Sequence, residues 1–215
     1  MRFILCIFLF FTCTSSVMGE YKDTIFLKKI YNAEQKVFNK VYINPNSNSW
    51  HYERLSNFGS IRKNKIEKSL QFPFGKWVSL YQYKNNLYTY FPCDWGTLLR
   101  LEIDAKKYTE HSFEEEEWQI KSIRAVSKRK FVLDIEYSVS KTNRKVIFYL
   151  VDDKKGIAVL EHIGSTGDRK YQLLIKNSNI KKIPMIINEC NSKAIEFQFD
   201  AINYISLLNN IGYYN

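Results

Sequence analysis

Residues 118–164 decide the fold, and they read WQIKSIRAVSKRKFVLDIEYSVSKTNRKVIFYLVDDKKGIAVLEHIG. Four short runs in this stretch, at 118–123, 131–137, 146–151 and 157–163, are rich in β-branched and aromatic residues. Polar segments that favour turns separate these runs, a pattern typical of consecutive antiparallel strands. Because the connecting segments are short, we expect each strand to pair with the next one along the chain, which predicts a meander.

The second and third of these runs carry the candidate ligand-binding residues. In the second run, Phe131 and Leu133 lie on an apolar face while acidic residues alternate with them, so one face meets a core and the other meets water. In the third run, Phe148 and Leu150 lie on one face, and the opposite face is apolar too. A strand that is apolar on both sides is covered on both sides by a helix, a second sheet, a ligand or a partner.

Further strand patterns flank this region, and one helical pattern lies near the C-terminus. The other expected strands and extended segments are at 23–31, 36–43, 50–55, 76–83, 87–91, 97–103, 106–111, 169–176, 183–188 and 194–199. Between 200 and 209, apolar residues recur at helical spacing after Asp200, which can cap the helix start. We predict one mostly β domain (20–215), an antiparallel meander of about ten strands that forms a barrel or half-barrel with one C-terminal helix.

The first 19 residues have the parts of a secretory signal peptide. A positive start is followed by an apolar run at 3–11 and by small and polar residues up to Gly19. No other apolar run approaches the roughly 20 residues that a membrane-spanning helix needs. We therefore predict a secreted or periplasmic protein without a transmembrane segment in its mature chain. A form that is lipid-anchored at Cys13 is the alternative.

The chain is basic, with 32 Lys and Arg residues against 22 Asp and Glu residues and a formal net charge of +10. This balance suits nucleic acid, anionic lipid or acidic glycans as partners. No arginine-rich tract or nucleic-acid-binding motif accompanies it, so we expect no nucleic-acid partner. Arg62, Lys63, Lys65 and Lys68 lie close together and form the candidate surface for an acidic protein partner.

After signal-peptide cleavage, the mature chain retains Cys93 and Cys190. An isolated pair of cysteines in an oxidising compartment tends to form a disulfide, which is our prediction. Two buried free thiols are the alternative. No histidine is close in sequence to either cysteine, so we expect neither to act as a catalytic nucleophile.

The three histidines, His51, His111 and His162, have no metal-binding spacing with one another or with a cysteine. A cation site between His111 and the acidic run at 114–117 is conceivable, but such runs are usually solvated loops. We expect His162 to lie on the sheet surface or as a satisfied core residue. The prediction is that the protein has neither a metal nor a cofactor.

No motif for nucleophilic, phosphate-binding or zinc-hydrolase chemistry is present, so we predict that the chain is not an enzyme. Lipocalin-like barrels and lipoprotein-carrier half-barrels share the predicted outline, an analogy of architecture alone. The leading hypothesis is a binding protein that carries a lipid or another apolar small molecule against Phe131, Leu133, Phe148 and Leu150. The alternative is a protein-interaction or inhibitor protein at the cell surface or in the periplasm, which binds an acidic partner.

Overall fold

The structure is a computed structural model, and it describes residues 25–32, 37–59, 72–94, 96, 98–164, 166–190 and 196–209. Two predicted features, the signal peptide with Cys13 and the basic cluster of Arg62, Lys63, Lys65 and Lys68, lie outside these residues. Among the helices of the described ranges, none is long and apolar enough to cross a membrane.

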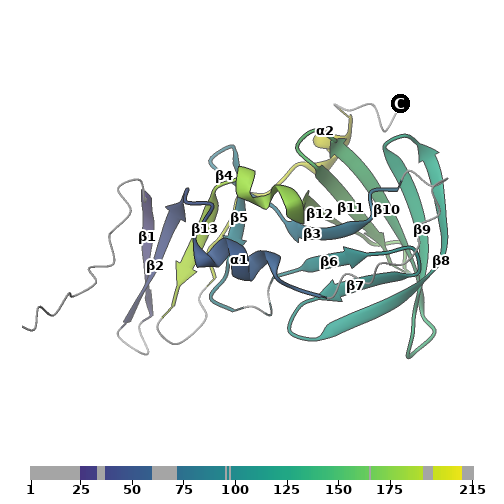
Figure 1. The fold of residues 1–215 in the computed structure, drawn as a ribbon, viewed down its shortest axis with the longest axis horizontal. Helices are drawn as coiled ribbons and strands as arrows, with labels where there is room; N and C mark the ends of the chain where they lie inside the picture. The colour runs from purple at the N-terminus through teal and green to yellow at the C-terminus, as the bar shows by residue number, and fades with distance from the viewer. Residues whose placement is uncertain are drawn as a thin grey trace, which may run out of the picture.

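Eight antiparallel strands close into a barrel, which lies at one end of the molecule (Figure 1). Around the barrel the order is β10-β11-β12-β3-β6-β7-β8-β9. These strands are β3 (Gly75–Ser79), β6 (Arg100–Ile103), β7 (Lys107–His111), β8 (Glu115–Ser127), β9 (Lys130–Tyr137), β10 (Asn143–Asp152), β11 (Ile157–Ile163) and β12 (Arg169–Lys176). Strands β8 to β12 each pair with the next one, so the predicted mostly β fold and its meander are confirmed.

The other end of the molecule is a five-stranded sheet with the order β1-β2-β13-β5-β4 (Figure 1). Its strands are β1 (Ile25–Asn32), β2 (Val37–Asn44), β4 (Tyr81–Tyr83), β5 (Asn86–Phe91) and β13 (Met185–Glu189). Strands β13 and β5 run parallel, an exception to the predicted antiparallel pairing. The strand predicted at 76–83 divides at buried Leu80 into β3 of the barrel and β4 of the sheet.

Large apolar side chains fill the interior of the barrel. Trp77 on β3 packs edge-on against Phe148 on β10 with 4.9 Å between ring centroids, and neither side chain has any exposed surface. Phe72, from the segment before β3, lies 5.2 Å from Phe131 and 5.4 Å from Phe148 between ring centroids. Since Phe131 stands near the start of β9, this aromatic group fills the barrel toward the end at which β9 begins.

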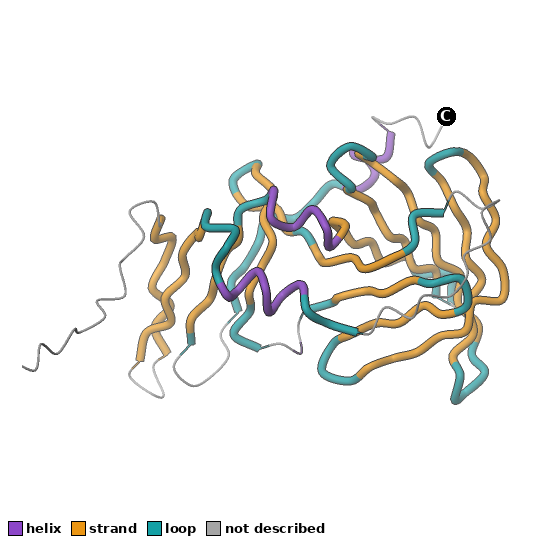
Figure 2. Tube along the Cα trace, viewed as in Figure 1, coloured by secondary structure: helices purple, strands orange, loops and turns teal. Residues whose placement is uncertain are grey.

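A second apolar layer joins the outer face of the barrel to the five-stranded sheet. Tyr149 points outward from β10 and is 1% exposed, packed in the same cluster as Met185 and Ile187 of β13. Three short helices contribute to this layer: α1 (Trp50–Ser56), the 3-10 helix η2 (Asn177–Lys182) and α2 (Tyr204–Asn209) (Figure 2). The prediction that β10 is covered on both faces is therefore confirmed.

Two of the segments predicted as extended are not strands. Residues 50–55 form helix α1 instead of an extended segment, because His51, Tyr52 and Leu55 bury one helical face against the core. The Tyr52 hydroxyl also donates a hydrogen bond of 2.6 Å to the carbonyl of Ile183. The predicted strand at 194–199 has no regular structure in its described part, 196–199, because only Asp200 bridges to a strand of the sheet.

One carboxylate is fully buried on the outer face of the barrel. Glu161 on β11 is 0% exposed and accepts hydrogen bonds from Tyr149 at 2.6 Å, Arg169 at 2.6 Å and Tyr171 at 3.1 Å. Three donors compensate a buried carboxylate for its lost hydration. The ring of Tyr204 on α2 stacks on Tyr171 at 5.4 Å between centroids, so this network also fixes the C-terminal helix.

The predicted disulfide joins Cys93 and Cys190, whose Cα atoms are 5.5 Å apart. Each cysteine follows a strand, Cys93 after β5 and Cys190 after β13. Because β5 and β13 are parallel neighbours, their carboxyl ends lie side by side and bring the two cysteines together. The bridge thus links positions that are 97 residues apart in the chain.

Replacing both cysteines tests how much this disulfide stabilises the folded protein. We expect the Cys93→Ser/Cys190→Ser protein to lose about 4–5 kcal/mol of unfolding free energy, since the open loop regains its entropy in the unfolded chain. Urea unfolding followed by circular dichroism measures this loss. The native protein treated with reductant is the matched control, and it should unfold at the same denaturant concentration as the double variant.

Candidate functional site

One end of the barrel carries polar side chains on its inner face. Glu110 on β7 pairs with core-facing Leu101, and His162 on β11 pairs with core-facing Val146. Directly paired residues project to the same side of a sheet, so these polar side chains point into the barrel. Three more residues point inward because their strand partners do: Arg144, Lys170 and Gln172 pair with Ile135, His162 and Leu160.

These side chains surround a pocket of about 320 Å³, which we call the barrel mouth. Its lining consists of Glu110, Arg144, His162, Gly164, Asp168, Lys170, Tyr171 and Gln172. The residues come from β7, β10, β11, β12 and the β11–β12 turn. Such a volume lies within the range of small-molecule sites, and the convergence of polar groups from several strands is typical of them.

His162 lies at the base of the mouth and is neutral at ordinary pH. Its Nε2 atom is 3.3 Å from the hydroxyl of Tyr108, which is fully buried. Burial, helped by the positive charges of Arg144 and Lys170, lowers the pKa of His162 to about 4. Its Nδ1 atom is buried without a hydrogen-bond partner. A neutral imidazole has one donor and one acceptor nitrogen, so either tautomer leaves one polar atom here unsatisfied.

Glu110 faces Arg144 across the mouth. Their Oε1 and Nη1 atoms are 3.7 Å apart, an ion pair that is too long for a hydrogen bond. Burial raises the pKa of Glu110, and neighbouring Glu116 raises it too, while Tyr108 and Arg144 act in the opposite direction. The Arg144 guanidinium lies 4.2 Å above the ring centroid of Trp118, a cation–π contact that holds it over the interior.

The rim of the mouth is fixed by local hydrogen bonds. Gln172 donates to the Ser79 hydroxyl at 2.6 Å, and this hydroxyl donates to the carbonyl of Leu99 at 2.6 Å. In the β11–β12 turn, the backbone of Gly164 lies against the Asp168 carboxylate. A Cβ atom at Gly164 would come within 2.2 Å of that carboxylate, so a larger residue there would require the Asp168 side chain to move. The rim is therefore preorganised.

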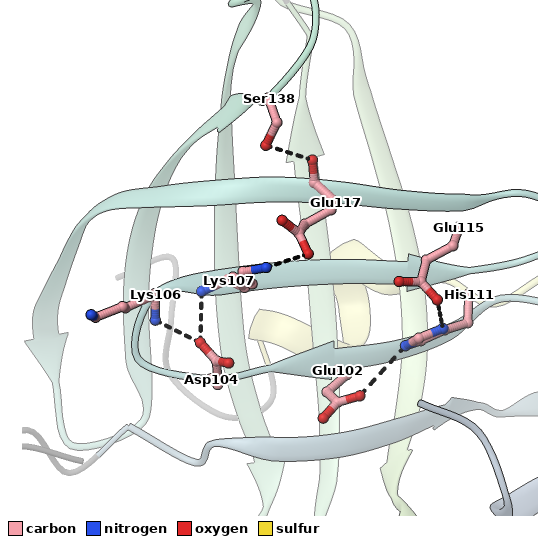
Figure 3. A network of polar contacts seen from close by, with 8 residues as sticks. All are labelled: Glu102, Asp104, Lys106, Lys107, His111, Glu115, Glu117 and Ser138. Atoms are coloured by element: carbon pink, nitrogen blue, oxygen red, sulfur yellow. Dashed lines mark hydrogen bonds and ion pairs between the residues drawn. The ribbon is translucent and has the colours of Figure 1, made fainter. Parts of the chain in front are cut away.

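A second polar cluster lies on the outer face of β6, β7 and β8 (Figure 3). His111 stands between two carboxylates, with Nε2 3.6 Å from Glu102 and Nδ1 3.2 Å from Glu115. Burial lowers the pKa of His111, although both carboxylates act to raise it. Lys107 forms a 2.6 Å ion pair with Glu117 nearby. The pocket at this cluster is small, about 90 Å³.

The acidic run therefore differs from its prediction. Glu115–Glu117 belong to β8 instead of a solvated loop, because they pair with β7 along the backbone. Glu117 also pairs with Lys107, and Glu115 with His111, both on β7. Within the described ranges, no group of three or more His, Cys, Asp or Glu side chains is arranged to hold a metal ion.

The four predicted ligand-binding residues lie together in the filled part of the barrel. Leu133 and Phe148 are 0% exposed, Phe131 is 1% and Leu150 is 8%. A side chain beside an internal cavity large enough for water would retain accessible surface. These residues are therefore packed against one another and against Phe72 and Trp77, as members of one apolar cluster.

Sequence reasoning missed the barrel mouth. His162 was expected on the sheet surface or as a satisfied core residue, yet it lies inside the barrel with Nδ1 unsatisfied. The signal was present in the period-two pattern, since His162 follows inward-facing Leu160 by two residues, and Arg144 precedes Val146 by two. Only closure of the barrel brings these strands around one pocket.

Comparison of the chain with models of protein families, with curated proteins and with solved structures gives no match. The interpretation of the mouth therefore rests on its geometry alone.

The pKa of His162 gives the barrel mouth a specific pH dependence. The folded-state value of about 4 lies below the ordinary value of 6.5, so the folded protein binds a proton less readily than the unfolded chain. This contribution to stability is complete above pH 6.5 and is lost as the pH falls toward 4. From the shift, we expect a loss of about 2 kcal/mol by pH 5.

The His162→Gln variant should lack this component of the pH dependence. Urea unfolding midpoints of the native and variant proteins at pH 7.5 and pH 5.0 measure the difference. The change in midpoint between the two pH values is compared in the native protein and the variant. The difference between these changes removes the contributions of His51 and His111, whose pKa values are also lowered by burial. Equal pH dependence in both proteins would contradict a buried, neutral His162.

Proposed function

We propose that this chain is an exported, non-catalytic binding protein that holds a small zwitterionic molecule at its barrel mouth. The observation that supports the proposal most directly is the pocket of about 320 Å³, where cations and carboxylates from different strands converge. Export is supported by the predicted signal peptide and by the Cys93–Cys190 disulfide, which suits an oxidising compartment.

The charges of the lining favour a ligand with both signs. Arg144 and Lys170 supply two cations, and Glu110 and Asp168 supply two carboxylates, so the formal charges of the lining cancel. A ligand with only one charge would match either the two cations or the two carboxylates. It would cover the other two charged side chains and remove their hydration without compensation. A small molecule with an ammonium and a carboxylate group, such as a free amino acid, matches both pairs.

An apolar cargo is less well supported by the packing. The predicted lipid-contacting residues Phe131, Leu133, Phe148 and Leu150 are in contact with other side chains throughout the core. A lipid chain would have to displace the rings of Trp77 and Phe72. Displacement of packed core side chains costs several kcal/mol, which lowers the affinity for such a ligand.

The protonation state of His162 argues against a role for this residue as a general base. An efficient general base has a pKa near the working pH. His162, with its pKa lowered to about 4, is far from that range at neutral pH. The arrangement holds charges and hydrogen bonds in fixed positions, which serves recognition.

Isothermal titration with a panel of free amino acids tests the proposal, with palmitate as the apolar comparison. We expect at least one amino acid to bind and palmitate to give no saturable signal. The Arg144→Gln variant should bind that amino acid at least tenfold more weakly, since a hydrogen bond between charged groups contributes about 1.5–3 kcal/mol.

The matched control is Lys154→Gln, which removes the same charge from an exposed residue of the β10–β11 turn. It should bind the amino acid as the native protein does. Palmitate binding that survives Arg144→Gln, or the absence of binding by every amino acid in the panel, would overturn the proposal.

A further inference from the structure

Strands β8 and β9 form a hairpin that extends beyond strand β7. Strand β8 pairs with β7 only as far as Gln119, whereas it pairs with β9 as far as Ser127. Residues 124–129 of this hairpin are exposed. Both strands lie at the end of the molecule away from the five-stranded sheet, so that sheet does not cover them (Figure 1). We call residues 124–130 the hairpin tip.

The hairpin tip carries four cations and no acidic residue, and the cations are Arg124, Lys128, Arg129 and Lys130. None of the ion pairs among the described residues involves any of these four side chains. Lys130 lies over the ring of Tyr149, with its Nζ atom 5.2 Å from the ring centroid. A group of cations without carboxylate partners creates a positive potential that attracts an anionic surface.

An apolar side chain stands among these cations. Val126 is 50% exposed. It lies in a β-bulge, because Ala125 pairs with Phe131 and Ser127 pairs with Lys130, which leaves Val126 without an opposite residue on β9. A soluble polyanion would contact the cations but would gain little from this side chain. A lipid surface offers partners to both, since its phosphates attract cations and its acyl boundary accepts apolar groups.

The connections beside the hairpin tip add further cations. The backbone amide of Leu150 donates a hydrogen bond of 2.8 Å to the carbonyl of Arg129, which places the end of β10 beside the tip. The β10–β11 turn that follows is itself neutral, with two lysines and two aspartates. The Asn179 amide of η2 donates a hydrogen bond of 3.0 Å to the carbonyl of Lys155 in that turn. Helix η2 has no acidic residue and ends in two exposed lysines, so the positive surface continues past the turn.

We propose that this end of the barrel docks on an anionic phospholipid surface. Val126 enters the boundary between headgroups and acyl chains, while Lys128 and Arg129 contact lipid phosphates. The hairpin tip lies at the end of β8, whereas Glu110 of the barrel mouth pairs with Glu116 at the start of that strand. The docked protein therefore keeps its mouth open to the solution. This surface goes beyond the proposed function and does not depend on the ligand of the mouth.

Sedimentation with lipid vesicles tests whether the surface binds. We expect the mature protein to bind vesicles of equal parts phosphatidylglycerol and phosphatidylcholine, and not to bind vesicles of phosphatidylcholine alone. Lys128→Gln/Arg129→Gln should bind the anionic vesicles at least about tenfold more weakly, because each cation near such a surface raises the affinity about fivefold. The matched control is Lys141→Gln/Lys145→Gln, which removes the same charge from exposed residues toward the mouth end and should bind as the native protein does.

A fluorescent label tests which end of the barrel meets the lipid. Cysteine is introduced by Val126→Cys or, as the control, by Val139→Cys in the β9–β10 turn, where the valine is 79% exposed. Each cysteine carries a dye that brightens in an apolar environment. With anionic vesicles, we expect the label at 126 to brighten and the label at 139 to remain unchanged.

Three results would overturn the proposal. The first is the absence of binding to anionic vesicles, including the case in which heparin oligosaccharides bind and would assign the tip to an acidic glycan. The second is an equal loss of binding in the two double variants, which would reduce the effect to net charge. The third is brightening of the label at 139 in place of the label at 126. Near-ultraviolet circular dichroism of each variant verifies its native packing.

Discussion

The filled interior of the barrel is the constraint on which the rest of this structure depends. An eight-stranded barrel encloses a space that either its own side chains or one small ligand can fill. Trp77, Phe148 and Phe72 occupy that space with their rings in contact, and none of them is more than 5% exposed. Polar inward-facing residues are then favoured near the ends of the barrel, where the packed rings leave room for them. The barrel mouth is the consequence.

The outer face of the barrel is governed by the same need to cover apolar surface. Strand β10 is apolar on both sides, so its outward Tyr149 requires a second layer. The five-stranded sheet and the three short helices supply that layer, and the Cys93–Cys190 bridge ties β13 to β5 within the sheet. Helix α1 lies at the junction of sheet and barrel (Figure 1), which is why its exposed face can form a pocket with Arg100.

The sequence predicts the regular parts of this fold and misses what closure creates. Alternating patterns identify the meander, and the disulfide follows from the predicted signal peptide and the cysteine count. Helix α1 is not predicted because the partners that bury it are distant in the sequence. The sequence does not predict the barrel mouth, because Glu110 and His162 are far apart in the chain. They line one pocket only when β7 and β11 join the same barrel. Local patterns cannot distinguish a packed core from a lined cavity, which explains the expectation of an apolar ligand at Phe131.

Xenon binding in crystals of the mature protein tests the central claim, that the barrel core is filled and that binding takes place at its polar end. Xenon enters apolar cavities that are large enough for a ligand and stays out of well-packed cores. The account predicts no xenon among the rings of Trp77, Phe131 and Phe148. A xenon atom bound at that position would reveal an apolar cavity, contradict the account and favour an apolar ligand inside the barrel.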